Sequence, residues 1–264
     1  MRESHRQVGA CILRAMIPPD YYSTRIAPMA PYEAALVAYH AGAEDAGIRL
    51  RSSLGEDEVL PAEVFFRHGE ALFPFERYAL ELARGRILDL GAGAGVHTLE
   101  LQDRGHDVVA LENCGALVDL MRERGARTAL RADFRWWRGP RFDTVLMLMN
   151  GIGPTATLAG LDRFFTHAQS FVTEGGQLLV DSAEAVPEPA PEPDDGVDRS
   201  VWPDAGGYAG QAWIDLEFEG RRGLPFRELY TDVETLRERA TDAGWTPDVA
   251  FEEDGAFLLR LTLR

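Results

Sequence analysis

Three glycines recur at every second position in one short segment, and an acidic residue stands just before them. The glycines are Gly91, Gly93 and Gly95, and the acid is Asp89. Glycine has no Cβ, so a backbone rich in it can turn tightly and approach a ligand closely. The apolar run before this segment predicts a strand. The residues after it predict a helix whose free N–H groups and positive dipole end point at the ligand. The segment predicts a ligand-binding loop, with a purely structural turn as the alternative.

The spacing of these glycines differs from that of the dinucleotide fingerprint. That fingerprint reads G-x-G-x-x-G, so its third glycine occupies the sixth position. Here the third glycine, Gly95, comes at the fifth position and Val96 occupies the sixth. The spacing therefore disfavours a nicotinamide-dependent dehydrogenase.

Two further acids follow the next two predicted strands. Glu112 ends the strand after the loop, about twenty residues on, where a carboxylate can accept hydrogen bonds from both hydroxyls of a ribose. Asp133 follows the third strand, where it can accept a hydrogen bond from an adenine amino group while Phe134 packs on the ring. The alternatives are a surface charge for Glu112 and a turn cap for Asp133. Together with the loop, these acids predict a site for an adenine nucleoside.

Other polar residues are candidates for chemistry near this site. Asn150, at the end of the fourth strand, can orient a second ligand or can be a turn residue before Gly151. His68 is a candidate base and His97 a polar group beside the loop, although a lone histidine is more often structural. Further candidates for lining a pocket, each equally explained by packing, are Asp181, Ser182, Tyr208, Trp213 and Tyr230.

Alternating strands and helices must position these residues. Apolar runs predict strands over 86–90, 107–112, 127–131, 142–149 and 176–181, and helical spacing predicts helices over 96–104, 115–124 and 157–173. Pro74 and Gly85 bound one more helix. This alternation is typical of an α/β fold, a doubly wound and mostly parallel sheet with helices on both faces.

Two additions to this sheet are expected to cover its ligand-binding edge as a lid. The domain proper is expected over 71–264. It is preceded by an N-terminal extension over 1–70, with a helix near 32–46 and a strand near 48–51. An insertion over 183–230 follows the fifth strand. Its first part, 184–199, is rich in proline and acid, which predicts a loop, and 212–218 and 226–230 predict a β-hairpin. Thr231 and Glu234 have capping-box spacing and open a helix that ends before Gly244, and strands are expected over 249–252 and 257–263.

Composition narrows the possible partners and the compartment. The formal charge is −16, and all 27 basic residues are arginine. Such a surface repels DNA and RNA, and the absence of lysine excludes a Schiff base and the lysine-dependent phosphate loop. Cys11 and Cys114 match no metal or disulfide spacing, no apolar run is long enough to span a membrane, and the polar N-terminus shows no signal segment. We expect a cytoplasmic protein, a monomer or homodimer, without a required metal, a nucleic-acid partner or a membrane association.

The chain from about residue 60 to 182 resembles the class I S-adenosylmethionine (SAM)-dependent methyltransferases. The motifs that carry the resemblance are Leu60-Pro61, Phe65-Phe66-Arg67, the segment from Leu88 to Gly95, Leu99 to Gln102, Phe142-Asp143-Thr144 and Leu148 to Gly153. Within that class they are similar to a bacterial subfamily whose substrates are undefined. The resemblance implies a seven-stranded, Rossmann-like sheet with an antiparallel last strand. It also implies that Asp89 and the glycines surround the methionine end of SAM, Glu112 the ribose, and Asp133 with Phe134 the adenine. One departure is that Asn113-Cys114, rather than a hydroxyl-bearing residue, follows the acid. The full set implied for the cofactor is Arg67, Asp89, Gly91, Ala92, Gly93, Gly95, Glu112, Asn113, Asp133, Phe134 and Met149.

The function predicted from this resemblance is methyl transfer from SAM to a small-molecule acceptor. The cofactor supplies the reactivity, and the protein holds the acceptor in line and, for some acceptors, removes a proton. Asn150 is the candidate for orienting the acceptor and His68 the candidate base. Action on a peptide or protein and a non-catalytic SAM-binding module stay open as alternatives. An aminopropyl transferase is disfavoured because no acidic cluster for a polyamine is evident. The nucleophile, whether oxygen, nitrogen, sulfur or carbon, is not determined by the sequence.

Overall fold

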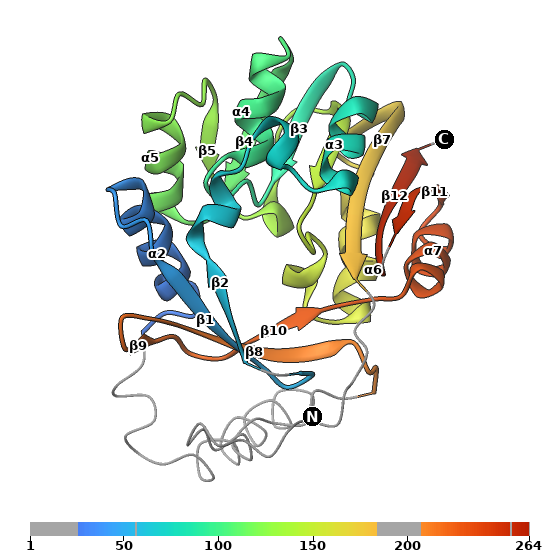
Figure 1. Ribbon diagram of the computed structural model, residues 1–264. Coiled ribbons are helices and arrows are strands. Elements are labelled where there is room, and N and C mark those ends of the chain that lie inside the picture. Colours follow the sequence, from blue (N-terminus) through green and yellow to red (C-terminus); the bar gives the residue numbers. More distant parts are fainter. Residues whose placement is uncertain (1–25, 56, 184–206, 254, 264) are drawn as a thin grey trace.

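A seven-stranded sheet forms the centre of the molecule (Figure 1). The computed structural model describes residues 26–55, 57–183, 207–253 and 255–263, so the loop predicted over 184–199 and the start of the N-terminal extension lie outside the described residues. The strand order is β11-β12-β7-β6-β3-β4-β5. The strands are β3 (Arg86–Leu90), β4 (Asp107–Glu112), β5 (Ala129–Arg131), β6 (Phe142–Met147), β7 (Val172–Ala183), β11 (Trp245–Glu253) and β12 (Ala256–Leu263).

The pairing of these strands confirms the predicted doubly wound sheet. Strand β3 pairs in parallel with β4 on one side and β6 on the other, so that Leu88 lies opposite both Val109 and Val145. All three side chains are buried, as expected for strands covered on both faces. The last strand, β12, runs antiparallel between β7 and β11. Because the chain reverses its direction of winding beside β3, the crevice beyond the carboxyl end of β3 is where such a sheet binds ligands.

Five α-helices cover this sheet: α3 (Pro74–Leu82), α4 (Val96–Asp103), α5 (Gly115–Glu123), α6 (Leu158–Ala168) and α7 (Val233–Asp242). Helix α6 ends at Ala168, five residues earlier than predicted, because the chain turns and β7 already begins at Val172. The cap predicted at Thr231 was wrong by one residue: the Asp232 carboxylate accepts the Thr235 N–H at 2.7 Å and so caps α7. Short 3-10 helices are η1 (Ala62–Phe66), η2 (Gly69–Ala71), η3 (Phe134–Trp136) and η4 (Gly153–Thr155). Among the described residues, no helix is long and apolar enough to cross a membrane.

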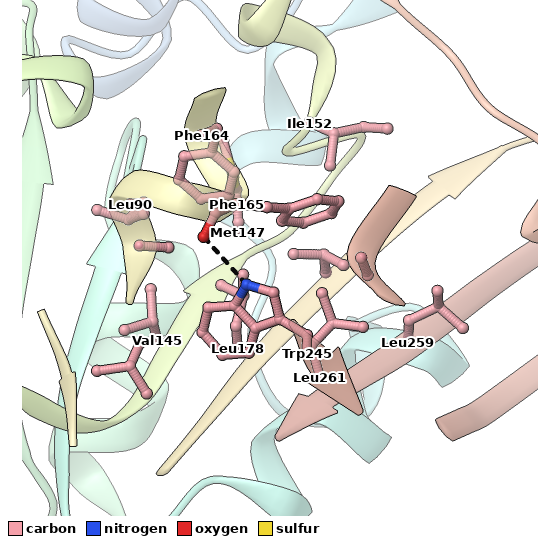
Figure 2. Close-up of a cluster of buried hydrophobic side chains, with 14 of the residues drawn as sticks. Leu90, Val145, Met147, Ile152, Phe164, Phe165, Leu178, Trp245, Leu259 and Leu261 are labelled. Carbon is pink, nitrogen blue, oxygen red and sulfur yellow. Dashed lines mark hydrogen bonds between the residues drawn. The ribbon is translucent and has the colours of Figure 1, made fainter. Parts of the chain in front are cut away.

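The core between the sheet and helices α6 and α7 is built around Trp245 (Figure 2). Its indole N–H donates to the Phe165 carbonyl at 3.0 Å, so the one polar atom of the ring is satisfied inside an apolar cluster. Leu178, Leu259 and Leu261 surround it and are fully buried. Burial contributes roughly 1.5–3 kcal/mol for each such side chain. This core fixes the last strands against the centre of the sheet.

A second sheet combines the N-terminal extension with the insertion. Its order is β10-β8-β1-β2, with β9 paired to β8. The strands are β1 (Gly47–Ser52), β2 (Glu58–Pro61), β8 (Gln211–Phe218), β9 (Arg221–Arg222) and β10 (Phe226–Leu229), and helix α2 (Ala30–His40) packs on one face. The hairpin predicted in the insertion is confirmed by the antiparallel β8–β10 pairing. The sequence did not predict β2 or the pairing of β1 with β8.

This second sheet lies across the end of the main sheet to which the β7 arrow points (Figure 1). Its two contributing segments are joined by a buried ionic cluster. The Asp215 carboxylate of β8 accepts from Arg222 Nε at 2.9 Å, and Arg51 of β1 donates to Glu217 at 2.9 Å. Asp215 is fully buried, and a buried charge of this kind is tolerated because it is paired. The extension and the insertion therefore form one structural unit over the ligand-binding edge.

Candidate functional site

A pocket of about 110 Å³ lies against the glycine loop that follows β3. Residues from four separate parts of the chain form its wall: helix α2, η1, the loop with the start of α4, and the segment after β6. They are Tyr32, Phe65, Asp89, Leu90, Gly91, Ala92, Gly93, Ala94, Val96, His97, Leu148 and Met149. The structure thus brings together Asp89, the first two loop glycines, Ala92 and Met149 of the set predicted for the cofactor.

The loop has the backbone conformation for which glycine is suited. The φ angles of Gly91, Gly93 and Gly95 are 69°, 55° and 89°, all in the left-handed region. Gly95 is the N-cap of α4, so the first turn of this helix is open toward the pocket. A Cβ on Gly91 would meet no atom within 4 Å, which shows free space on that side of the backbone.

Glu112 holds the same loop from the end of β4. Its carboxylate accepts the Gly93 N–H at 3.1 Å and the Cys114 N–H at 2.9 Å. Burial raises the pKa of Glu112, and these backbone donors partly oppose the shift. The carboxylate is fixed beside the pocket and still has lone pairs for further donors. Its neighbour Asn113 is exposed, and the Asn113 carbonyl accepts from Arg131.

Buried acids and bases support the floor of the pocket. Asp89 accepts from the Thr98 hydroxyl at 2.6 Å, and burial raises the pKa of Asp89. Glu76 of α3 lies 2.9 Å from His97 Nε2 and accepts from Arg67 at 2.7 Å. This network links the pocket to α3.

The charges in this network shift the pKa values of His97 and Glu76. Burial lowers the pKa of His97, but the hydrogen bond with Glu76 and the negative charges nearby outweigh burial, so the net shift is upward. Burial raises the pKa of Glu76, and the contacts with His97 and Arg67 reverse that shift, so the net change is downward. Both shifts favour the charged form of the His97–Glu76 pair, and the Nε2 atom of His97 is already engaged by Glu76.

Arg67 reaches this network from the end of η1. Its NH2 group binds Glu76 and lies 3.9 Å from the Met149 sulfur, and its guanidinium stacks 3.7 Å from the centre of the Phe73 ring. The other two guanidinium nitrogens, Nε and NH1, are buried and have no hydrogen-bond partner within the described part of the chain. Buried donors of this kind are usually satisfied, so they are free for an acceptor from a ligand.

The roof of the pocket comes from residues that the sequence did not mark as binding residues. Tyr32 of α2 and Phe65 of η1 both line the pocket, and their rings meet edge to face at 5.0 Å. A Cβ on Gly93 would lie 3.0 Å from the Tyr32 hydroxyl, so the tyrosine lies directly over the loop. Burial raises the pKa of Tyr32, which stays protonated. No motif signals Tyr32, because its place depends on the packing of α2 against the main domain.

Asp133 and Phe134 lie outside this pocket, beyond the end of β5. The Asp133 carboxylate caps η3 by accepting the Arg135 N–H at 2.9 Å, and it also binds the Arg135 guanidinium. Burial raises the pKa of Asp133, but the bonds to Arg135 outweigh it and the net shift is downward. The Phe134 ring is partly buried and meets Phe164 edge to face at 5.4 Å. The turn-cap alternative for Asp133 is therefore realised, and its carboxylate still lies at the edge where the strands end.

The backbone is strained at two residues of the segment that follows β6. Met149 and Asn150 have φ angles of 64° and 52°, unusual for residues with a side chain. Asp181 of β7 holds this turn by accepting the Asn150 N–H at 3.0 Å and the Gly151 N–H at 3.3 Å. Burial raises the pKa of Asp181 to about 6. Strain of this kind persists where the surroundings enforce it and is common at functional sites.

The remaining candidates are not brought into the pocket. His68 is exposed, precedes η2 and is absent from the pocket lining, so the structure does not place it as a base at this site. The Tyr208 hydroxyl donates to Asp232, the Trp213 ring contacts Arg227, and Ser182 donates to the Asn150 side chain. Tyr230 donates to Glu228 of β10, a residue that the sequence analysis did not single out.

Solved structures resemble the whole described fold. The crystal structure of a SAM-dependent methyltransferase from Bacteroides fragilis, in complex with S-adenosyl-L-homocysteine, is 29% identical, with coverage of 90% of this chain and 96% of that one and a TM-score of 0.76. DesVI from Streptomyces venezuelae is 19% identical (72% and 92% coverage, TM-score 0.52), and the CcbJ methyltransferase from Streptomyces caelestis is 17% identical (72% and 88%, TM-score 0.53). The latter two show the fold alone. No protein-family model and no curated protein matches the chain.

The fold matches that of a solved SAM-dependent methyltransferase, which agrees with the resemblance found in the sequence. The comparison supports an enzyme that transfers methyl groups, with SAM as the cofactor.

Proposed function

We propose that the protein transfers a methyl group from SAM to a small-molecule acceptor. The observation that carries this proposal is the pocket at the glycine loop, closed by the second sheet's own helix and 3-10 turn, in a fold shared with the Bacteroides fragilis methyltransferase. A pocket roofed by Tyr32 and Phe65 favours an acceptor that can enter a confined site. The cytoplasmic location, the absence of a nucleic-acid partner and the choice of monomer or homodimer stay predictions.

The residues around the pocket fit the chemical groups of SAM. Arg67 offers a positive charge and two buried donors, which have no partner among the described residues, to the carboxylate of the methionine end. Glu112 offers lone pairs to the ribose hydroxyls, and Asp133 with Phe134 offers an acceptor and a ring to the adenine. SAM bound there supplies an electrophilic methyl group on a sulfonium sulfur.

The protein's own part is to position and to exclude water. The glycine loop lets the backbone approach the cofactor, and Met149 lies at the wall where the acceptor side begins. Asp181 holds the strained turn in place, which fixes Asn150 as an orienting group for the acceptor. Fixed geometry of this kind accelerates a displacement by aligning the reacting atoms.

Calorimetric titration of the purified full chain with SAM and with S-adenosylhomocysteine tests this proposal. Micromolar binding of both ligands, and a higher melting temperature in their presence, are the expected results. A folded sample that binds neither would overturn the proposal.

A further inference from the structure

A carboxylate stands on the inner face of the second sheet, beside the turn that follows β6. Antiparallel pairing places Phe226 opposite Ile214 and Glu228 opposite Ala212, and directly opposed residues share a face of a sheet. Ala212 and Ile214 are buried in the core beneath this sheet, and Phe226 packs against the same core. Glu228 is thus an acidic side chain on a largely apolar face. Departures from the expected pattern of this kind occur mainly at functional sites.

The contacts of Glu228 are all with groups near the acceptor side of the proposed site. Its carboxylate lies within 3.4 Å of the point where a Cβ on Gly153 would stand, and the Asn150 amide nitrogen lies 2.8 Å from that same point. The Tyr230 hydroxyl donates to Glu228 Oε2 at 3.0 Å. Burial raises the pKa of Glu228, and Tyr230 and Asn150 oppose the shift without cancelling it.

The oxygen and the nitrogen of the Asn150 side-chain amide differ in their contacts. Its oxygen accepts from the Ser182 hydroxyl at 3.1 Å, which leaves the amide nitrogen turned toward Glu228. That nitrogen is buried and has no hydrogen-bond partner among the described residues. The Asn150 amide nitrogen and the Glu228 carboxylate thus face one another, and the amide favours the ionised form of the carboxylate.

The same short turn connects this pair to the pocket. Met149 lines the pocket and Asn150 is the next residue, and both are held in left-handed conformations. Asp181 also contacts the turn, and each of its oxygens accepts one N–H, from Asn150 and from Gly151. Glu228 and the Asn150 amide face one another beside this turn, whereas His68 is exposed.

We propose that Glu228 receives the acceptor's proton and that the acceptor is therefore an amine or an alcohol, a nucleophile that still carries a proton when it enters. This inference rests on the proposed function. The acceptor's lone pair forms the new bond to the methyl carbon while the carbon–sulfur bond breaks and leaves its electron pair on sulfur. The proton of the nucleophile passes to the Glu228 carboxylate, and Asn150 holds the nucleophile through its free amide N–H. A thioether or a tertiary amine has no proton to give up and has no use for this base.

The test compares three probes of similar shape on the full chain saturated with S-adenosylhomocysteine. Benzylamine and benzyl alcohol carry a proton on the nucleophile, and benzyl methyl ether does not. Their dissociation constants are measured by saturation-transfer NMR on the wild type and on Glu228→Gln. Glu219→Gln serves as the control, because Glu219 is exposed and belongs to the same insertion. S-Adenosylhomocysteine affinity is measured on all three proteins.

The expected result is that the amine, the alcohol or both bind at least fivefold more weakly to Glu228→Gln, while the ether binds the wild type and both variants equally. The amine and alcohol arms distinguish the two kinds of nucleophile. S-Adenosylhomocysteine binding stays within twofold throughout. Equal binding of the protic probes to wild type and Glu228→Gln, or no binding of either to the wild type, overturns this inference and leaves the proposed function standing. If the wild type does not bind S-adenosylhomocysteine, the proposed function itself is overturned.

A second variant, Tyr230→Phe, keeps the test decisive if Glu228→Gln fails to fold. Glu228 is faced by Tyr230 at the end of its own strand and by Asn150 from the turn after β6, and the charge of Glu58 on β2 acts on Tyr230. Removing the hydroxyl takes away a donor that favours the ionised carboxylate. Binding of the protic probes then requires a higher pH than in the wild type. An unchanged pH profile overturns the inference, because a purely structural Glu228 would not control the binding of the probes.

Discussion

The donor side and the acceptor side of the proposed site are built in different ways. On the donor side, the consecutive residues of the glycine loop form one wall of the pocket, and both carboxylates beside the loop are already partnered: Asp89 by Thr98, Glu112 by the Gly93 and Cys114 N–H groups. On the acceptor side, residues distant in the sequence are brought together by the second sheet, and the Asn150 amide nitrogen has no hydrogen-bond partner among the described residues, as is also true of Arg67 Nε and NH1 on the donor side.

This difference matches the two tasks of a methyltransferase. A cofactor that is always the same can be met by a fixed loop whose hydrogen bonds are complete before it binds, which reduces the loss of conformational entropy on binding. An acceptor side assembled from an extension and an insertion can vary while the sheet beneath stays the same. The donor side should therefore respond to backbone changes, and the acceptor side to changes of single functional groups.

The largest effect is expected from Gly93→Val, which breaks the donor side at its backbone. The φ angle of 55° is unfavourable for a β-branched residue, and the new Cβ would stand 3.0 Å from the Tyr32 hydroxyl. We expect S-adenosylhomocysteine affinity to fall more than about 100-fold, or about 3 kcal/mol. Calorimetric titration measures it. Gly105→Val is the matched control, because Gly105 has a φ of 90°, open space around it and no place in the pocket. Comparable losses in both variants would show a general folding defect instead.

Arg67→Lys should have the next largest effect. It tests whether Arg67 binds the carboxylate at the methionine end of SAM. Lysine keeps the positive charge but has one donor nitrogen in place of three, so it has no equivalent of Nε and NH1, which have no partner among the described residues. Affinity for S-adenosylhomocysteine should fall about tenfold, or about 1.4 kcal/mol. Methylthioadenosine lacks the amino acid part and should bind the variant as it binds the wild type. Equal weakening of both ligands would place Arg67 elsewhere than at the carboxylate.

The donor side could be predicted from the sequence to a larger extent than the acceptor side. The glycine loop, Asp89 and Glu112 are close in the chain, and their positions relative to one another follow from a strand, a turn and a helix in succession. The seven-stranded sheet and its antiparallel last strand were also predicted correctly. Tyr32, Phe65 and Glu228 could not be predicted in their roles, because their positions depend on the pairing of β1 with β8 and on the packing of α2. Nothing in the local pattern of either segment specifies its partner.

The errors at the ends of elements have local physical reasons. Helix α6 was predicted to continue to residue 173 from its apolar periodicity, but Phe171 and Val172 already belong to the turn and to β7, where the same apolar side chains are buried by the sheet. The strand predicted to end at Met149 ends at Met147, because Asp181 draws the following N–H groups into the turn. Neither contact can be predicted from the local pattern of apolar residues in the sequence.

Asp181→Asn sharpens the comparison at the boundary between the two sides. The pKa of Asp181 is about 6 in the folded protein and ordinary, near 3.8, in the unfolded chain. The folded state therefore binds more protons between these values, and the stability contributed by this group is lost as the pH rises through about 6. The free energy of unfolding of the wild type, relative to that of the variant, should fall by about 1.3 kcal/mol between pH 5 and pH 7. Urea unfolding of both proteins at each pH measures this difference.

A difference that stays constant across this pH range would mean that Asp181 is ionised throughout. The turn would then be held by a full charge even at pH 5, and its strain would be fixed independently of pH. A suitable control is Asp248→Asn, because Asp248 lies on β11 in an exposed pair with Arg260. Surface pairs of this kind contribute little to stability, so this variant should follow the wild type at every pH.

The smallest effect is expected from Asp133→Asn, at the adenine end of the donor side. The Asp133 carboxylate is partly exposed and bound to Arg135, so a ligand amino group would compete with a partner already present. We expect S-adenosylhomocysteine affinity to fall about threefold, or about 0.6 kcal/mol, since solvent screens this site. S-Inosylhomocysteine has an oxygen in place of the amino group and should bind both proteins equally. If the two ligands weaken alike, Asp133 acts only as the cap of η3, and the donor side ends at Glu112.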